Sequence, residues 1–255
     1  MHPVLFDWGP LRIHSYGLMV AAGFAAAMLL ARRRISESPF SFSRLLDFGV
    51  ALLIGGLAGG RLLYVVMNAA YFRVHPWEML MIHHGGLSYF GALAGGLAAG
   101  VWFIRRIGAP FWEAADFMII WVPLAHAVGR VGCFLNGCCW GTASTVPWAV
   151  KFPHLGYAAH PTQLYEALAN LALFGLMQVI FKRKLFAGQA LLSYGVLYGT
   201  TRFLLEFLRG DSPHAVLGFL TPFQVMAAFL VVVSLAAWAP LALRSFFPLG
   251  RCEEA

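Results

Sequence analysis

The stretch GRVGCFLNGCCWG, residues 129–141, places one arginine, one asparagine and three cysteines in sequence that is otherwise apolar and small. The guanidinium of Arg130 stays charged in a protein. It binds phosphate or carboxylate through two parallel hydrogen bonds. An ionisable side chain within an apolar segment indicates function by default, so we expect Arg130 to hold an anion.

Two further apolar segments carry charges. Arg61 lies in GGRLLYVV, and Arg202 lies in YGTTRFLLEFLR. Tyr198 and Glu206 stand four residues on either side of Arg202, so the three side chains share one helix face. An internal ion pair between helices is the structural alternative for Glu206. Because only Glu206 and Glu166 are near these arginines, the surplus positive charge favours an anionic ligand, and a lipid phosphate is the nearest one.

Other polar side chains open three of the apolar segments, in the motifs RIHSYGLM, IHHGGLSYFG and AHPTQLYEAL. A lone histidine at such a place is more often an interfacial hydrogen-bonding group than a catalyst. The convergence of several polar residues on one membrane face is the informative feature. They are His14, Ser15, Tyr16, His83, His84, Ser88, Tyr89, His160, Gln163, Tyr165 and Glu166.

The composition identifies the elements that must position these residues. The 255 residues are 60% hydrophobic and 11% charged, whereas a soluble domain has about 25% charged residues. A bilayer core needs about 20 mostly apolar residues per helix. The sequence therefore predicts an all-α, polytopic membrane protein with seven transmembrane helices. They are expected at 12–31, 45–67, 86–104, 111–129, 162–181, 189–208 and 219–243.

The basic residues predict the orientation of these spans. Groups at 32–44, 105–110 and 182–184, together with Arg244 and Arg251, hold 11 of the 18 lysines and arginines and follow alternate spans. Positive residues concentrate in cytoplasmic loops. The N-terminus is therefore expected outside and the C-terminus in the cytoplasm. This bias also explains the net charge of +7, and no binding of nucleic acid is expected.

The chain is expected to form a single transmembrane domain, residues 1–255. Its outward-facing segment at about 130–161 is too short to fold alone. Spans two and three contain glycines four residues apart, a spacing that lets helix backbones approach closely. Among them are Gly55, Gly59, Gly91 and Gly95.

Six motifs, taken together, resemble bacterial prolipoprotein diacylglyceryl transferases. They are HSYGLM, GGRLLYVV, HHGGLSYFGA, GRVGCFLNGCCWG, HPTQLYEAL and YGTTRFLLEFLR, in the family's order. The resemblance implies a seven-span enzyme of the bacterial plasma (inner) membrane. It implies transfer of the diacylglyceryl group of phosphatidylglycerol to the thiol of a lipoprotein signal-peptide cysteine, with release of glycerol phosphate. The expected partners are phosphatidylglycerol, the prolipoprotein signal peptide and membrane lipid, and no cofactor is expected.

The resemblance also assigns functional residues, and it shows where the chain departs from the family. Phe90 stands where other members have a histidine, and Cys133 and Cys138 replace an asparagine and a glutamate. The chain is therefore expected to be a variant member. The residues that match the family's functional positions are Tyr16, Arg130, Asn136, Gly141, Tyr198, Arg202 and Glu206.

The implied reaction is attack of a thiolate on a glycerol carbon, with phosphate as the leaving group. Arg130 and Arg202 suit the phosphate, because a positioned charge stabilises the negative charge that develops on it. With Tyr16 and His14 they are the expected catalytic residues, and Arg61 joins the expected substrate-binding residues. The general base stays open among His14, His160, the His83–His84 pair and Glu206.

Cys133, Cys138 and Cys139 admit four interpretations. Their spacing differs from that of paired CxxC ligands, and we expect no metal. A covalent lipid carrier is disfavoured, because the nucleophile of the implied reaction belongs to the substrate. A disulfide on the oxidising side and apolar packing beside a crowded backbone are favoured. Cys252 is expected on the cytoplasmic tail, in the reduced form.

A transporter or channel for an anionic solute is the alternative function, since intramembrane arginines fit that class too. It predicts charges deep in several spans and an internal repeat. In this sequence the charges cluster at the outer ends of spans, which favours the transferase.

Overall fold

The computed structural model describes residues 1–9, 11–81, 85–212 and 218–246. The chain forms two compact units. One unit joins Met1–Arg33 to Ala115–Ala255, and the other is Arg34–Ala114.

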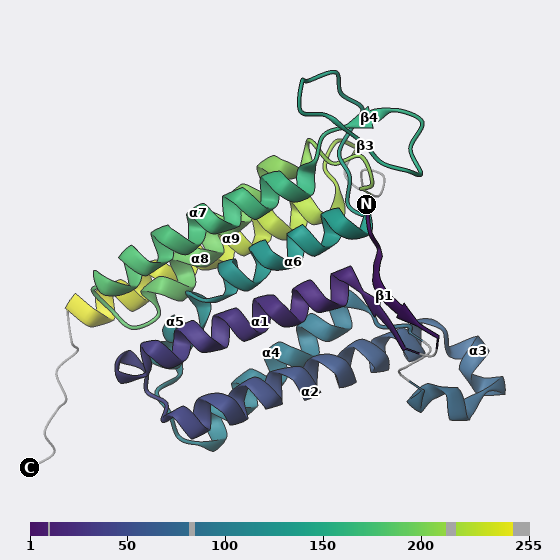
Figure 1. The fold of residues 1–255 in the computed structure, drawn as a ribbon. Coiled ribbons are helices and arrows are strands. Elements are labelled where there is room, and N and C mark those ends of the chain that lie inside the picture. Colours follow the sequence, from purple (N-terminus) through teal and green to yellow (C-terminus); the bar gives the residue numbers. More distant parts are fainter. Residues whose placement is uncertain (10, 82–84, 213–217, 247–255) are drawn as a thin grey trace, which may run out of the picture. The chain divides into compact units, whose positions relative to one another are not determined.

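The first unit is a set of long helices, each packed on the next. α1 packs on α6, α6 on α7, α7 on α8, and α8 on α9, and the last three run side by side with α6 in Figure 1. Two short antiparallel hairpins, β1 with β2 and β3 with β4, lie at helix ends. The bounds are β1 (Val4–Trp8), β2 (Leu11–His14), α1 (Ser15–Arg33), α6 (Val122–Asn136), β3 (Val150–Lys151), β4 (Ala158–Ala159), α7 (Thr162–Lys182), α8 (Gln189–Glu206) and α9 (Pro222–Phe246).

The second unit is built on a close pair of helices, α2 and α4. A Cβ added at Gly95 would lie 2.2 Å from the carbonyl oxygen of Gly55, and one added at Gly91 would lie 2.3 Å from that of Gly59. The backbones therefore touch where the glycine spacing predicted close approach. The elements are the 3₁₀ turn Ile35–Glu37, α2 (Phe42–Met67), α3 (Ala69–Val74), the 3₁₀ turn Pro76–Leu80 and α4 (Tyr89–Arg106), with α5 (Phe111–Ile119) at the boundary between the units.

A short interruption separates α5 from α6. Pro123 stands at the start of α6, where its missing N–H costs nothing. The side chain of Gln178 on α7 donates to the carbonyl of Ile120 at 3.2 Å, which satisfies an acceptor at the interruption. The helix then continues past its predicted end at residue 129 to Asn136. Arg130 and Asn136 are consequently on the same helix.

The helical prediction is confirmed, with two short hairpins in addition. Among the described residues, five helices are long and apolar enough to cross a membrane. Their outer faces are apolar: Ile54 of α2 and Val232 of α9 are each 63% exposed. Such surfaces are expected where a protein faces lipid. The five are Ser15–Arg33, Phe42–Met67, Phe111–Asn136, Thr162–Lys182 and Pro222–Leu243. α4 and α8, of 18 residues each, occupy the positions of the third and sixth predicted spans.

Candidate functional site

Glu166, in the first turns of α7, is the centre of a buried charge cluster. Its side chain is only 4% exposed. Its Oε2 lies 2.6 Å from Nε of Arg130 on α6. Its Oε1 lies 3.3 Å from Nη1 of Arg209 and 3.8 Å from Nη1 of Arg202 on α8. One carboxylate thus joins α6, α7 and the end of α8.

Two more carboxylates complete the cluster. Glu206 Oε2 lies 2.6 Å from Nη1 of Arg202, as the four-residue spacing on one helix face predicted. The hydroxyls of Ser212 and Thr221 donate to its Oε1 at 2.6 and 2.9 Å. Asp211 Oδ1 lies 2.9 Å from Nη2 of Arg209, and burial raises the pKa of the Asp211 carboxyl.

The expected surplus of positive charge is therefore wrong for this cluster. Three arginines face three carboxylates, so the formal charges balance. The third carboxylate, Asp211, was not among the predicted residues and follows Arg209 by two residues in the loop after α8. An anionic ligand must therefore displace a carboxylate or use guanidinium nitrogens that the carboxylates leave open.

Arg130 offers such nitrogens. Its Nε lies 3.2 Å from Nε2 of His126, one turn earlier on α6, in addition to its contact with Glu166. Both of these contacts are made through Nε, so the Nη1 and Nη2 atoms are the candidate contacts to a ligand. A guanidinium binds phosphate through two parallel N–H donors, and the Nη edge presents such a pair.

His126 was missed at the sequence level and belongs to the site. Its ring centroid lies 5.5 Å from that of Tyr198, which stacks on Tyr194 at 5.3 Å. The predicted residue Tyr198 thus reaches Arg130 through His126. The available signal was the four-residue spacing between His126 and Arg130, which puts both on one helix face.

Of the two predicted catalytic residues in the N-terminal motif, Tyr16 lies near the site and His14 does not contact it within the described residues. Gly132 of α6 lies against the start of α1, where an added Cβ would be 3.3 Å from Cα of Tyr16. Tyr16 has Arg130 and Cys133 among its electrostatic neighbours, and it is 43% exposed. His14 ends β2 and is exposed. In the described part of the chain it shares no hydrogen bond or ion pair with the arginine cluster.

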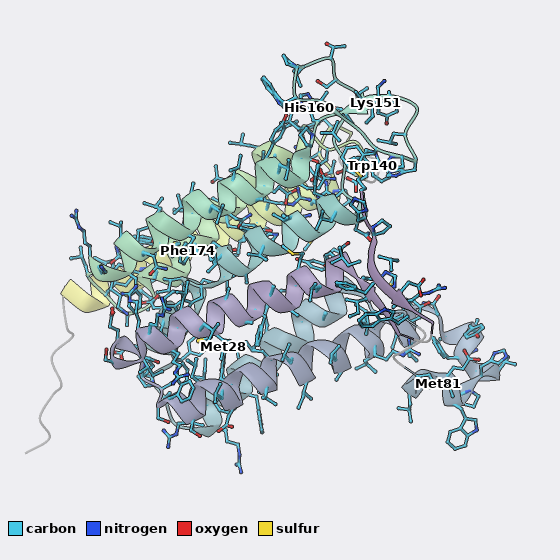
Figure 2. All side chains as sticks on the ribbon, in the orientation of Figure 1. Met28, Met81, Trp140, Lys151, His160 and Phe174 are labelled. Carbon is cyan, nitrogen blue, oxygen red and sulfur yellow. The ribbon has the colours of Figure 1, made fainter. Side chains whose placement is uncertain are left out.

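Gly141 stands where three chain segments cross. Its N–H donates to the carbonyl of His160 at 2.9 Å. An added Cβ would lie 2.6 Å from Cβ of His160 and 2.7 Å from the carbonyl oxygen of Leu208. Trp140 and His160 lie together beyond the ends of α6 and α7 (Figure 2). Gly141 therefore positions the loop, and His160 itself turns to Tyr165, whose hydroxyl is 3.1 Å from its Nδ1.

The three cysteines converge at the end of α6. Gly137 adopts the left-handed conformation, φ 79°, and the N–H of Cys138 donates to the carbonyl of Cys133 at 3.2 Å. This is the Schellman arrangement, which brings the side chains of those two positions into contact. Cys139 also has a left-handed backbone, φ 64°. The three sulfur atoms all lie within 4.8 Å of one another.

The convergent cysteines are free thiols, so of the two favoured interpretations, apolar packing and a disulfide, the disulfide is not formed. Cys133 is buried, and Cys138 and Cys139 are half-buried. Hydrogen bonds from the other two thiols lower the pKa of Cys139 below its usual range, and the charges of Arg209 and Arg130 act in the same direction. Asn136 lies beside the thiol of Cys138.

Arg61 and Phe90 lie in the other unit. The guanidinium of Arg61 donates to the carbonyls of Met79, Gly85 and Gly86 at 2.9, 2.6 and 3.0 Å, and also to those of Glu78 and Met81. It is 8% exposed. These contacts favour a structural role for Arg61, which holds the segment after α3. Phe90 is in the first turn of α4 and is 44% exposed. His83 and His84, the other candidate bases, are outside the described residues.

Comparison with known proteins points to one family. A family model described as prolipoprotein diacylglyceryl transferase matches residues 3–239. A phosphatidylglycerol–prolipoprotein diacylglyceryl transferase of Methylococcus capsulatus is 38% identical, over 93% of this chain and 95% of its own length. Enzymes of the same name from Vibrio vulnificus and Bordetella parapertussis are each 36% identical, over 93% and 98% of this chain and 91% and 97% of their own lengths.

Proposed function

The chain belongs to the prolipoprotein diacylglyceryl transferase family, and we propose that it transfers the diacylglyceryl group of phosphatidylglycerol to a signal-peptide cysteine. The products are a thioether on the peptide and free glycerol phosphate. The substrates proposed are those in the shared name of the relatives. The proposal is supported by a match that covers nearly the whole length of both chains. The transporter alternative finds no support in these relatives.

The observation that carries the chemistry is the buried guanidinium of Arg130, which contacts Glu166 and His126 through Nε. Glu166 and His126 hold its Nε from two sides, so the guanidinium plane is fixed before the lipid arrives. A preorganised donor costs no reorganisation when charge develops on the leaving phosphate. Arg130 is the proposed phosphate clamp.

The other predicted residues take supporting roles in this proposal. Arg202 lies over the ring of Phe223, 5.3 Å from its centroid, and supplies a second positive charge through its shared partner Glu166. Tyr198 positions His126, and half-exposed Tyr16 faces the lipid beside α6. Asn136 and Gly141 shape the loop that receives the peptide. His14 and Glu206 stay candidates for the base, and Arg61 for substrate binding.

The proposed setting is a bacterial plasma (inner) membrane. The seven helical segments cross it with the N-terminus outside and the C-terminus in the cytoplasm, and residues 1–255 act as one membrane domain. Apolar helices of spanning length support a multi-pass protein. Arginine and lysine groups at alternate helix ends support the orientation. The loop of residues 137–161 then lies on the outer side, where lipoprotein precursors are presented.

A reconstitution assay tests the function. The purified full chain in nanodiscs containing phosphatidylglycerol is mixed with a synthetic signal peptide that carries one cysteine. The expected result is a peptide whose mass has risen by one diacylglyceryl group, with release of glycerol phosphate. A peptide with serine in place of cysteine is the control and should stay unmodified. Folded protein that yields no thioether in phosphatidylglycerol membranes contradicts the assignment.

A further inference from the structure

The cluster of three thiols, Cys133, Cys138 and Cys139, has no role in the proposed transfer reaction. Its sulfur atoms come from one helix end and the loop behind it, within 4.8 Å of one another. A Zn–S bond is about 2.3 Å long. Three thiolates bound to one zinc ion are therefore roughly 3.8–4.0 Å from one another. Small side-chain rotations of Cys138 and Cys139 therefore close the cluster around an ion.

The backbone under the cluster is held in place before any ion binds. The carbonyl of Cys138 accepts from Nε2 of Gln163 at 2.6 Å, and that of Cys139 accepts from the hydroxyl of Thr162 at 2.8 Å. Both donors come from the first turn of α7 and are fully buried. They hold Cys139 in a left-handed conformation that is unfavourable for a residue with a Cβ. Such strain is retained where the position of a side chain matters.

The electrostatic surroundings suit a metal–thiolate group. Arg130 and Arg209 are the positive neighbours of Cys139. Three thiolates and one divalent cation leave a net charge of minus one, and the two guanidiniums lie next to that charge while also paired with Glu166 and Asp211. Zn²⁺ prefers sulfur and nitrogen ligands, and a site with three protein ligands keeps a fourth position open for water or substrate.

The carboxylates and the histidine of the charge cluster are already engaged by arginine. An arginine pairs with each of the three carboxylates, Glu166, Glu206 and Asp211. Nε2 of His126 accepts a hydrogen bond from Nε of Arg130. The substrate thiol nevertheless must lose its proton, because the thiolate is the nucleophile. A metal ion deprotonates a thiol that binds to it.

We propose that Cys133, Cys138 and Cys139 bind one Zn²⁺ ion whose open fourth position takes the thiol of the signal-peptide cysteine. This inference rests on the proposed transferase function. It departs from the sequence prediction of no metal, which considered spacing along the chain and not the convergence at the helix end.

The reaction then balances without a redox step. The peptide thiol binds zinc and gives up its proton. The bound thiolate attacks the glycerol carbon that is esterified to phosphate; a carbon–sulfur bond forms and the carbon–oxygen bond breaks. The electron pair of that bond leaves with glycerol phosphate, which takes up one proton and is held by Arg130. The thioether product is a weaker ligand than the thiolate and dissociates.

Metal content and spectroscopy test the site itself. The purified wild-type chain should contain about one zinc per chain, and the Co²⁺ form should show a sulfur-to-cobalt charge-transfer band. Cys133→Ser and, separately, Cys138→Ala should lose both signals. Cys252→Ser, which removes the remaining cysteine of the chain, is the matched control and should keep them. Wild-type protein without zinc, or with a disulfide among the three cysteines, overturns the proposal.

Addition of peptide to the Co²⁺ form tests the open position. The cysteine peptide should strengthen the charge-transfer band because a fourth sulfur binds, whereas the serine peptide should leave it unchanged. A band that does not respond to the cysteine peptide overturns the role of the metal in binding the substrate.

Transfer assays separate this inference from the proposed function. Removal of zinc by a chelator should lower the rate of transfer by about 10²-fold or more, the range of a lost proton-transfer catalyst, and Zn²⁺ should restore it. Full transfer by zinc-free enzyme overturns the metal site and leaves the function standing. Zinc binding with a peptide response but no transfer from phosphatidylglycerol contradicts the function and leaves the site supported.

Discussion

At the scale of single residues, the buried guanidinium of Arg130 is distinguished by how it is held. Its Nε contacts Glu166 and His126, and its Nη atoms are the proposed contacts to phosphate. A lysine at the same place would present one point charge and could not reproduce both the inner contacts and a two-point contact to phosphate.

Replacement of Arg130 tests its role directly. Arg130→Ala should lower kcat/KM for transfer by about 10²–10³-fold, the usual cost of a lost donor to a developing anion, and Arg130→Lys should recover little of it. The rate is measured in the nanodisc assay. Arg12→Lys is the matched control, since Arg12 forms an exposed pair with Asp7 and should keep its rate. Near-normal turnover by folded Arg130→Ala would remove this arginine from the mechanism.

Glu166 is predicted to matter for stability more than any other carboxylate of the cluster. Glu166→Gln leaves Arg130, Arg202 and Arg209 with one partner fewer in a buried site, and breaking a buried pair costs about 3–5 kcal/mol. The thermal unfolding midpoint in detergent should fall clearly. Asp7→Asn, which breaks an exposed pair, should leave it within error. Equal midpoints for the two variants would mean that the cluster does not hold the helices together.

Residue types predicted part of this site. A charge in apolar sequence identified Arg130 and Arg202, and a four-residue spacing predicted the pair of Arg202 with Glu206. Periodicity within one helix cannot show which residue of another helix will sit between them, so the central place of Glu166 was not predicted. The Cys-x-x-x-Gly-Cys pattern from Cys133 to Cys138 did contain a local signal, since a glycine at that position forms a Schellman end and brings the two cysteines together.

At the scale of elements, the crossing at Gly141 ties three segments into one support for the loop. Gly141→Ala places a Cβ 2.6 Å from that of His160, a distance that real contacts do not reach. We expect loss of folded protein, or of transfer, measured by size-exclusion yield and the nanodisc assay. Gly156→Ala is the matched control in the same loop, because nothing lies within 4 Å of its added Cβ. Similar behaviour of both variants would show that the crossing tolerates expansion.

The helix pair α2–α4 offers a second contrast between neighbouring glycines. Gly95→Ala meets backbone at 2.2 Å, whereas Gly96→Ala meets its nearest neighbour at 3.7 Å. Overpacking of this kind costs about 1–3 kcal/mol, so the thermal midpoint of Gly95→Ala should fall and that of Gly96→Ala should not. A reversed order would mean that the two helices pack differently.

Apolar length predicted the helices well and their ends less well. Each of the seven predicted segments is mostly helical, with the fourth divided between α5 and α6, because runs of apolar residues of that length have few other solutions. The extension of α6 to Asn136 was missed, since the charge of Arg130 resembled the end of a span. The hairpins β1–β2 and β3–β4 were not predicted, because strands of two to five residues leave almost no periodic pattern.

At the scale of the whole molecule, the basic residues make a prediction about topology. α7 runs from Thr162 to Lys182, so its two ends should lie on opposite sides of the membrane. Reporter fusions should place Lys182 in the cytoplasm, by the positive-inside rule, and His160 outside. Fusions that place both residues on the same side would reject the seven-span topology and the outward position of the loop.

The balanced charge of the arginine–carboxylate cluster has a consequence for biogenesis. Arg130 leaves the ribosome well before its carboxylate partner, because Glu166 lies on the next helix of the chain. During insertion α6 therefore enters the bilayer with the charge of Arg130 uncompensated. An arginine at the centre of a span costs about 2.5–3.5 kcal/mol, and the cost for Arg130 is smaller because it lies toward the outer end of its helix. The ion pair with Glu166 stabilises α6 in the membrane only after α7 has been inserted. The order of synthesis therefore makes insertion of α7 the step that completes the assembly of this cluster.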